Sequence, residues 1–183
     1  MLELTSRQAV MADVSELTAL MDAAISELQI GYVDDGQIEA SRTIMGLDTE
    51  LIEDGTYFVV AIDGEVAGCG GWSRRATLYG GNQTSGRDSG LLDPAVDAAR
   101  VRAMYTHPRF ARRGVGRRIL SLCEEAAAAE GFRRLELMAT LSGEPLYSAY
   151  GFQARERLLI DTANGVAVPC VRMHKSVRPD LLT

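Results

Sequence analysis

A predicted β-hairpin is the sequence feature that most restricts the fold of this chain. Residues 56–62 (TYFVVAI) are rich in β-branched and aromatic side chains, and residues 65–74 follow as a second strand-like stretch. The dipeptide Asp63-Gly64 between them favours a tight two-residue turn. The two strands are therefore expected to be antiparallel neighbours, which argues against a fold built only from parallel strands.

Helical and strand-like stretches alternate along the rest of the chain. Further strands are expected at residues 2–9, 99–106, 133–139, 152–160 and 166–175, and helices at residues 14–28 (with Asp13 as N-cap), 36–45, 48–53, 114–130 and 144–150. This order predicts an α/β fold with an α+β-type mixed sheet, organised as a single domain over residues 1–183. Residues 76–97 form the longest irregular segment, for which a functional loop and a mobile surface loop are both open.

Composition excludes several classes of protein. The net charge of −6 disfavours general binding to nucleic acid. No apolar run approaches the roughly 18 residues that span a membrane, and the N-terminus lacks a secretory signal, so a cytoplasmic protein is expected. Three widely spaced cysteines (Cys69, Cys123 and Cys170) and two histidines suggest buried, reduced thiols and no metal site.

The segment Val101–Arg118 (VRAMYTHPRFARRGVGRR) carries the clearest chemical signal. A strand leads through a turn into a helix that begins near Gly114 and Gly116. The first N–H groups of a helix lack intrahelical partners and favour anions. Four arginines crowd this helix start, where cations oppose the helix dipole. We interpret the segment as an anion-binding site; the alternative is that the arginines only extend into water.

Two common phosphate-binding motifs do not fit this segment. A Walker loop requires a lysine that is missing, and a dinucleotide fingerprint requires a third glycine where Ile119 stands. A protein that binds a nucleotide through either of these two motifs is therefore a weaker hypothesis.

The residues Met104-Tyr105-Thr106-His107-Pro108 through Ala111-Arg112-Arg113-Gly114-Val115-Gly116 resemble the coenzyme A motif of the GNAT family, the GCN5-related N-acetyltransferases. A second segment, Leu146-Tyr147-Ser148-Ala149-Tyr150-Gly151-Phe152, resembles the Tyr-x-x-x-Gly-Phe signature of the same family. Two departures occur: Ala111 stands where the family has Gln or Arg, and Thr140 where many members have Asn.

The resemblance implies a GNAT-like fold whose central, mostly antiparallel sheet has two splayed strands, with acetyl-CoA bound between them. It implies that backbone groups of Met104 and Thr106 pair with the pantetheine arm, and that N–H groups from Arg113 to Arg117 hold the pyrophosphate. The cofactor-binding residues expected on this basis are Met104, Tyr105, Thr106, Arg112, Arg113, Gly114, Val115, Gly116, Arg117 and Thr140.

The same resemblance implies direct attack by an amine in a ternary complex, without an enzyme nucleophile. Tyr147 matches the general-acid tyrosine of the family, the alternative being a packing role. Glu136 is a candidate base, although its alternating position on a strand fits an ordinary solvated residue equally well. Weaker candidates for the base are Glu65, Asp34, Asp35 and His107.

The main functional hypothesis is an N-acetyltransferase that uses acetyl-CoA and a primary amine, carried by a small molecule or a protein. The alternative is a non-catalytic, regulatory acyl-CoA-binding module. The acceptor pocket is expected near residues 25–46 and 74–97, where Ile30, Tyr32 and Tyr79 are candidate lining residues and Trp72 fits core packing better. A homodimer is common in the family, and no nucleic-acid or membrane partner is expected.

Overall fold

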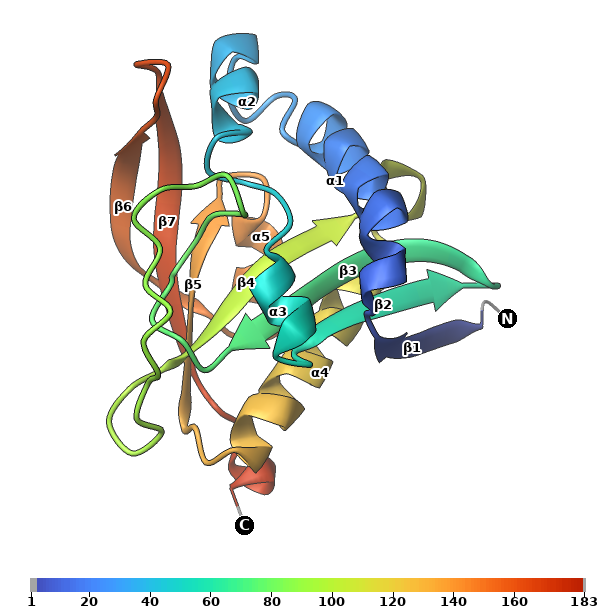
Figure 1. The fold of residues 1–183 in the computed structure, drawn as a ribbon, viewed down its shortest axis with the longest axis vertical. Helices are drawn as coiled ribbons and strands as arrows, with labels where there is room; N and C mark the ends of the chain where they lie inside the picture. The colour runs from blue at the N-terminus through green and yellow to red at the C-terminus, as the bar shows by residue number, and fades with distance from the viewer. Residues whose placement is uncertain (1–2, 183) are drawn as a thin grey trace.

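Seven strands form one open sheet in the order β1-β2-β3-β4-β5-β7-β6 (Figure 1). The computed structural model describes residues 3–182. The strands are β1 (Leu4–Gln8), β2 (Tyr57–Ile62), β3 (Glu65–Ser73), β4 (Ala99–Thr106), β5 (Arg134–Thr140), β6 (Gln153–Asp161) and β7 (Ala167–Ser176). Every neighbouring pair is antiparallel except β4 and β5, which are parallel. The predicted mixed, mostly antiparallel sheet is therefore confirmed.

Helices cover both faces of the sheet (Figure 1). They are α1 (Val14–Leu28), α2 (Asp35–Ser41), α3 (Thr49–Glu53), α4 (Val115–Ala129) and α5 (Glu144–Tyr150). The main apolar cluster joins α4 to the sheet, and a second cluster joins α1 and α3 to the opposite face. Within residues 3–182, none of these helices has the length and apolar character needed to cross a membrane.

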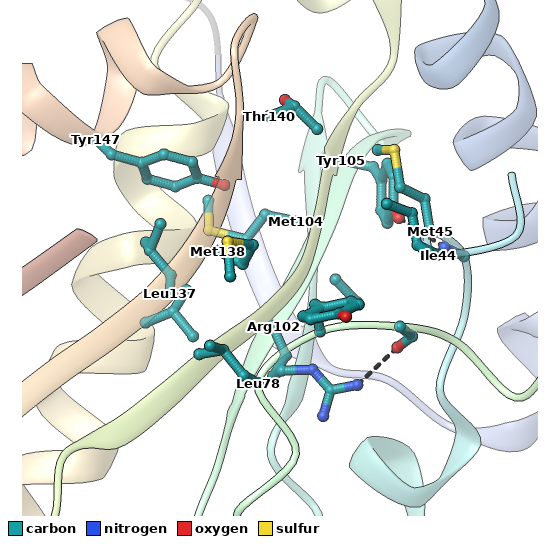
Figure 2. Close-up of a pocket in the computed structure, with 15 residues that line it drawn as sticks. Ile44, Met45, Leu78, Arg102, Met104, Tyr105, Leu137, Met138, Thr140 and Tyr147 are labelled. Atoms are coloured by element: carbon teal, nitrogen blue, oxygen red, sulfur yellow. Dashed lines mark hydrogen bonds between the residues drawn. The ribbon is translucent and has the colours of Figure 1, made fainter. Parts of the chain in front are cut away.

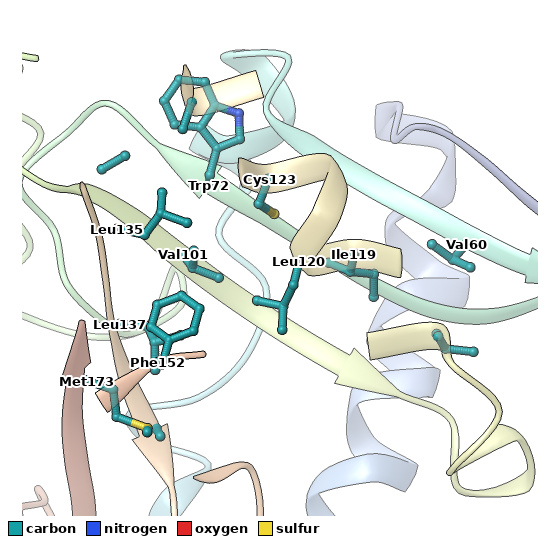
Figure 3. Packing of buried hydrophobic residues seen from close by; sticks show 14 of the residues in the cluster. Val60, Trp72, Val101, Ile119, Leu120, Cys123, Leu135, Leu137, Phe152 and Met173 are labelled. Carbon is teal, nitrogen blue, oxygen red and sulfur yellow. The ribbon is translucent and has the colours of Figure 1, made fainter. Parts of the chain in front are cut away.

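Helix α4 lies unusually close to β3 because β3 contains glycines (Figure 3). A Cβ atom at Gly70 would come within 2.7 Å of Cγ2 of Ile119, which is fully buried. At the other end of the helix, Trp72 packs edge-on against Phe132 with ring centroids 5.9 Å apart. Trp72 is 1% exposed, so it belongs to the core, as expected.

Two local expectations were wrong. The second helix ends at Ser41 instead of residue 45, because residues 42–47 turn away and the N–H of Gly46 donates to the buried hydroxyl of Tyr105 (2.8 Å). Asp13 occupies the N-cap position of α1, but its side chain caps nothing there. Its carboxylate accepts the N–H of Val10 (2.8 Å) and pairs with Arg7 (2.8 Å), which closes a preceding 3₁₀ turn.

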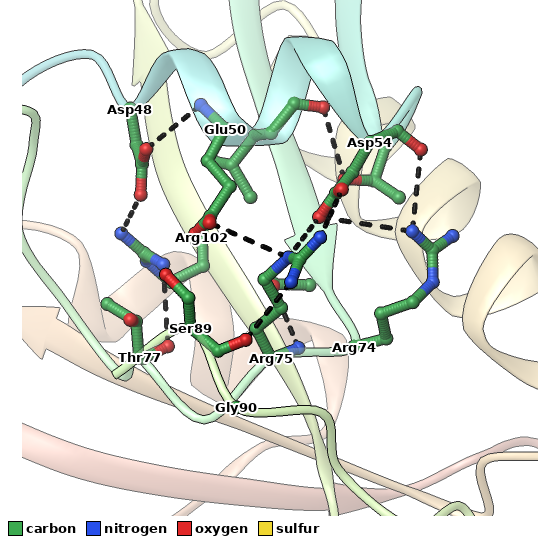
Figure 4. Close-up of polar contacts among 12 residues, drawn as sticks. Asp48, Glu50, Asp54, Arg74, Arg75, Thr77, Ser89, Gly90 and Arg102 are labelled. Carbon is green, nitrogen blue, oxygen red and sulfur yellow. Dashed lines mark hydrogen bonds and ion pairs between the residues drawn. The ribbon is translucent and has the colours of Figure 1, made fainter. Parts of the chain in front are cut away.

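The long segment at residues 76–97 is fastened to the sheet by a buried ion pair (Figure 4). Arg102 of β4 donates to Asp48 (2.9 Å) and to the carbonyl of Gly80 (2.6 Å). The Asp48 side chain is fully buried, and Arg87 of the segment lies 2.7 Å from its other carboxylate oxygen. The carboxylate also accepts the N–H of Glu50 at the start of α3 (3.1 Å). One carboxylate therefore joins β4, α3 and the segment.

We predict that Asp48→Asn destabilises the protein strongly. The amide keeps the hydrogen bond at the start of α3 but leaves the buried Arg102 guanidinium without a counter-charge, which costs about 3 kcal/mol of unfolding free energy. Urea denaturation measures this loss. The matched control is Asp22→Asn, since Asp22 is 69% exposed in its pair with Arg42 and should lose less than about 1 kcal/mol. Equal effects of the two variants would contradict the prediction.

Candidate active site

Strands β4 and β5 separate soon after they meet. Their pairing covers only Ala99 with Leu135 and Arg100 with Glu136. Both strands continue beyond these pairs, to Thr106 and Thr140. The result is a V-shaped cleft whose walls carry the sequence-predicted residues Met104 and Thr140.

A bulge in β4 shapes one wall of the cleft. The pairing with β3 shifts between Cys69 and Gly71, so Ala103 and Met104 have no partner residue in β3. Ala103 has φ +49°, an uncommon value for a residue with a side chain. The hydroxyl of Tyr57 donates to the Ala103 carbonyl (2.6 Å), which holds the bulge in place. Since β5 has also diverged, the backbone of Met104 faces the cleft without a strand partner on either side.

The start of α4 lies beside the open end of β4. Gly114 is its N-cap residue and has φ +85°, in the left-handed region that favours glycine. A Cβ atom at Gly114 would meet nothing within 4 Å. No side chain caps the helix, and its first turn contains no acidic residue. The unpaired N–H groups of this turn are thus available to a ligand from outside.

The arginines around this helix start have no counter-charge in the described chain. Arg112, Arg113 and Arg117 are exposed, and none has a carboxylate within 4.0 Å among residues 3–182. The Arg113 guanidinium stacks 5.7 Å from the ring centre of Phe110, and that of Arg117 lies 5.7 Å from the ring of Tyr150. This unpaired positive charge, at a helix end whose dipole is also positive, fits a pyrophosphate better than it fits an empty surface.

Gly116 has a packing function in addition to any role in binding. A Cβ atom there would lie 2.5 Å from Cδ2 of Leu146 in α5. The glycine therefore allows α5 to pack directly against α4. This contact fixes the helix that carries Tyr147 relative to the one that carries the arginines.

The motif around Tyr147 has a clear structural basis. Helix α5 ends at Gly151, which has φ +109°, and the N–H of Phe152 then returns to the carbonyl of Tyr147 (2.9 Å). The rings of Tyr147 and Phe152 meet edge-on, with centroids 6.0 Å apart. Tyr150 instead donates its hydroxyl to the buried Glu124 (2.7 Å). Tyr147 is thus the tyrosine of this helix that faces the cleft.

Two hollows of about 80 and 150 Å³ occupy the cleft and meet at Met104, Thr140 and Tyr147 (Figure 2). Figure 2 shows the Tyr147 hydroxyl pointing toward the methionines that line the cleft. That hydroxyl has no hydrogen-bond partner among the described residues. Burial raises the pKa of Tyr147 above its ordinary value of 10.0, so the phenol keeps its proton at neutral pH.

Apolar side chains and polar groups both line the smaller hollow. Ile44, Met45, Leu78 and Met138 contribute to it, and the segment at residues 78–80 covers one side. Arg102 is the charged residue among its described lining residues, and Asp48 already neutralises Arg102. A ligand bound in this hollow would therefore contact no carboxylate among the described lining residues.

Glu136 lies apart from this cleft, contrary to its expected role as base. Its two carboxylate oxygens pair with Arg100 and, at 2.5 Å, with Nε of Arg172. It sits where β4 and β5 are still paired, and it lines neither hollow of the cleft. A carboxylate that two arginines hold is a poor proton acceptor, so the placement does not support a catalytic role.

The weaker base candidates also lie outside the two hollows. Glu65 pairs with Arg109 at the surface (2.5 Å), and Asp34 caps α2 by accepting the N–H of Gln37 (2.8 Å). Asp35 lies in the first turn of α2, and His107 accepts the N–H of Arg109 through Nδ1 (3.2 Å). Each has a surface or capping role of its own.

Two further residues shape the site and were missed in the sequence. The sequence pattern around Tyr57 predicts a strand, but it does not indicate that the Tyr57 hydroxyl holds the β4 bulge. A Cβ atom at Gly68 would overlap the Val115 side chain, so a glycine at this position leaves space for the start of α4. The concentration of glycines at residues 68–71, inside a predicted strand, was the available signal for such a close approach.

Comparison with known proteins agrees with this geometry. The model of the acetyltransferase (GNAT) family matches residues 18–152. A search of curated protein sequences finds no significant match. Among solved structures, a GCN5-related N-acetyltransferase from Rhodopseudomonas palustris has a TM-score of 0.69 and 20% identity, covering 94% of each chain.

Two other similar structures contain the cofactor. YncA from Salmonella typhimurium, solved with its cofactor acetyl-CoA, has a TM-score of 0.63 and 17% identity, covering 96% of this chain and 95% of its own. The PaiA N-acetyltransferase from Thermoplasma acidophilum, in complex with coenzyme A, has a TM-score of 0.63 and 13% identity, covering 95% of this chain and 99% of its own. With the family model matching most of its length, the chain belongs to the acetyltransferase (GNAT) family, whose cofactor is acetyl-CoA.

Proposed function

We propose that this protein is an N-acetyltransferase that transfers the acetyl group of acetyl-CoA to a primary amine. The observation that carries the proposal is the V-shaped cleft between β4 and β5. Its two hollows meet beside Tyr147, and its lining residue Leu146 packs on the first turn of the cationic α4. The cleft gives one ligand an entry at its open end and leaves a second space beside the same tyrosine.

The residues along the cleft suit the two ends of acetyl-CoA. The first-turn N–H groups of α4, together with Arg112, Arg113 and Arg117, would hold the pyrophosphate. The backbone of Met104 and Thr106, left without partners toward β5, would pair with the pantetheine arm. When bound, acetyl-CoA supplies the acetyl group as a thioester. The N–H of Met104 would donate to the oxygen of that group.

Tyr147 is proposed as the general acid. Its hydroxyl is free of protein partners, points into the cleft and keeps its proton because of burial. It would protonate the departing coenzyme A thiolate. A module that only binds acyl-CoA, the alternative function, would have no use for this free hydroxyl.

The acceptor would enter the smaller hollow as a neutral amine. With Glu136 held elsewhere, no described carboxylate lines that hollow, so we propose that water takes the amine proton. A lining without a free carboxylate disfavours polycationic acceptors. We therefore expect acceptors that carry a single amine.

Acetyl transfer can be screened by release of coenzyme A thiol with a disulfide dye. The protein itself should give little background, since its three cysteines are buried. Burial raises the pKa of Cys69 to about 12 and that of Cys170 to about 11, which keeps both unreactive at neutral pH.

We predict that Tyr147→Phe lowers kcat by about 100-fold, the usual contribution of a general acid. Affinity for coenzyme A should stay within about twofold, since the ring and its packing against Phe152 remain. Steady-state kinetics and calorimetry measure the two effects. Tyr150→Phe, which removes the other hydroxyl of α5 outside the cleft, is the matched control and should keep its kcat. Full turnover by Tyr147→Phe would rule out the acid role.

The cofactor placement predicts that Gly114→Asp weakens coenzyme A binding at least tenfold, about 1.4 kcal/mol. The new carboxylate would face the phosphates at the start of α4. Gly114→Asn is the control, because it introduces a side chain of the same shape at the same positive φ without the charge. Calorimetry with coenzyme A compares the two variants. Equal affinities for Asp and Asn would place the pyrophosphate elsewhere.

The pH dependence follows from the direction of one pKa. An acid functions only below its pKa, and burial raises the pKa of Tyr147 above its ordinary 10.0, so its acid form persists through pH 10. The amine attacks only when neutral, so kcat/KM should rise with pH to the pKa of the acceptor, about 8 for an α-amino group and about 10.4 for a lysine-like amine. The value of kcat/KM should not decrease with rising pH at any pH below 10. A descending limb centred below pH 9 would contradict the assignment.

A further inference from the structure

Another hollow, which we call the arginine hollow, lies outside the cleft, on the part of the sheet where β4 and β5 are still paired. It measures about 360 Å³ and shares no lining residue with the cleft. Small-molecule sites range from roughly 300 to 1,000 Å³. Four strands contribute one arginine each: Arg100 from β4, Arg134 from β5, Arg155 from β6 and Arg172 from β7. Residues 96–98 form its rim.

The charges in this hollow do not balance. Its acidic lining residues are Asp97 and Glu136, and Glu136 is already shared by Arg100 and Arg172. Arg134 donates to the carbonyl of Val96, which is a neutral partner. Lys175 also lines the hollow but pairs with Glu124 on α4.

Arg155 has no carboxylate within 4.0 Å among residues 3–182. Arg155 and Arg134 thus add two positive charges, and Asp97 is the one remaining carboxylate of the lining that could offset them. This concentration occurs on a chain whose net charge is −6.

The hollow also contains buried nitrogen atoms without hydrogen-bond partners. Nε of Arg100 and Nε2 of His174 are both shielded from solvent and unpaired. An unpaired buried donor costs free energy, so such atoms call for an explanation. Burial and the nearby Arg155 and Arg134 lower the pKa of His174. An anion in the hollow would offset the arginine charges beside these nitrogens.

We propose that this hollow binds a phosphate group, either free or as the phosphoryl end of a small metabolite, through Arg134, Arg155 and His174. Four oxygens on one phosphorus accept from donors that arrive from several strands, and guanidinium groups suit them in pairs. A flat carboxylate would reach fewer of these donors. The volume leaves space for a carbon skeleton beside the phosphate. The proposal does not depend on the acetyl-transfer reaction.

The test uses NMR of the two histidines, titrating the full-length protein with inorganic phosphate. Coenzyme A is kept at saturation, so that the start of α4 is occupied. The ring signal of His174 should shift and saturate with a dissociation constant below about 1 mM. Its apparent pKa should rise, because a bound anion favours the imidazolium form. His107, which lines a different hollow, is the internal reference and should not respond.

Variants separate a site from general charge effects. Arg134→Gln with Arg155→Gln should weaken phosphate binding at least tenfold. Arg157→Gln removes the same charge from β6 at a residue that pairs with Glu144 outside the hollow, and it should bind phosphate normally. Glycerol 3-phosphate forms the second arm. Tighter binding than inorganic phosphate assigns the site to a phosphomonoester, and weaker binding assigns it to free phosphate.

Two results would overturn the proposal. One is a linear, non-saturating shift of His174, which would mean that phosphate only screens the arginines. The other is equal weakening by Arg157→Gln and by the double variant, which would trace binding to overall charge. If each variant keeps its affinity for coenzyme A, each variant is folded, and its phosphate affinity can be compared with that of the wild type.

Discussion

The divergence of β4 from β5 is the constraint on which the rest of the structure depends. A parallel pair of this length would normally satisfy its backbone groups along the whole interface, yet here the ladder covers two residue pairs. Several contacts near the cleft stabilise the strand segments that this early separation leaves unpaired. The bulge at Ala103 turns β4 away, Tyr57 satisfies the carbonyl that the bulge exposes, and Tyr105 reaches across to Gly46. The remaining unpaired backbone is what a ligand can use.

A second constraint keeps the two halves of the site together. Helix α4 presses on β3 at Gly68 and Gly70, and α5 presses on α4 at Gly116. In each contact a side chain of a helix lies directly on a glycine, so the arginine-rich helix start and the Tyr147 helix are packed closely onto the rest of the fold. A methyl group at Gly68 or Gly70 would overlap Val115 or Ile119 of α4, and one at Gly116 would require the Leu146 side chain to move. Glycine therefore sets the relative position of the proposed anion-binding helix end and the proposed proton donor.

The sequence predicted the elements well where a local signal existed. The Asp63-Gly64 turn, the strand at 99–106 and the helix at 144–150 agree with the structure because turn chemistry and periodicity fix them locally. The pattern could not predict how long β4 and β5 stay paired, because that depends on a bulge and on distant partners. Glu136 shows the same limit: its alternating position was visible, but Arg100 and Arg172 come from other strands. The prediction of cofactor-binding residues came from motifs and could not have come from periodicity alone.

The arginines of this chain show why a residue type does not determine its role. Arg74 pairs with Glu130 at the end of β3. Arg75 pairs with Asp54 (Figure 4). Arg102 pairs with Asp48 inside the protein. The arginines at the start of α4, and Arg134 and Arg155 of the arginine hollow, lack such partners, although the acidic chain contains 25 carboxylate residues. Arg133 is also exposed and has no carboxylate partner among residues 3–182, so a missing partner alone does not mark a site. At the start of α4 the free first-turn N–H groups, and in the arginine hollow its volume, are the additional features that favour an external anion.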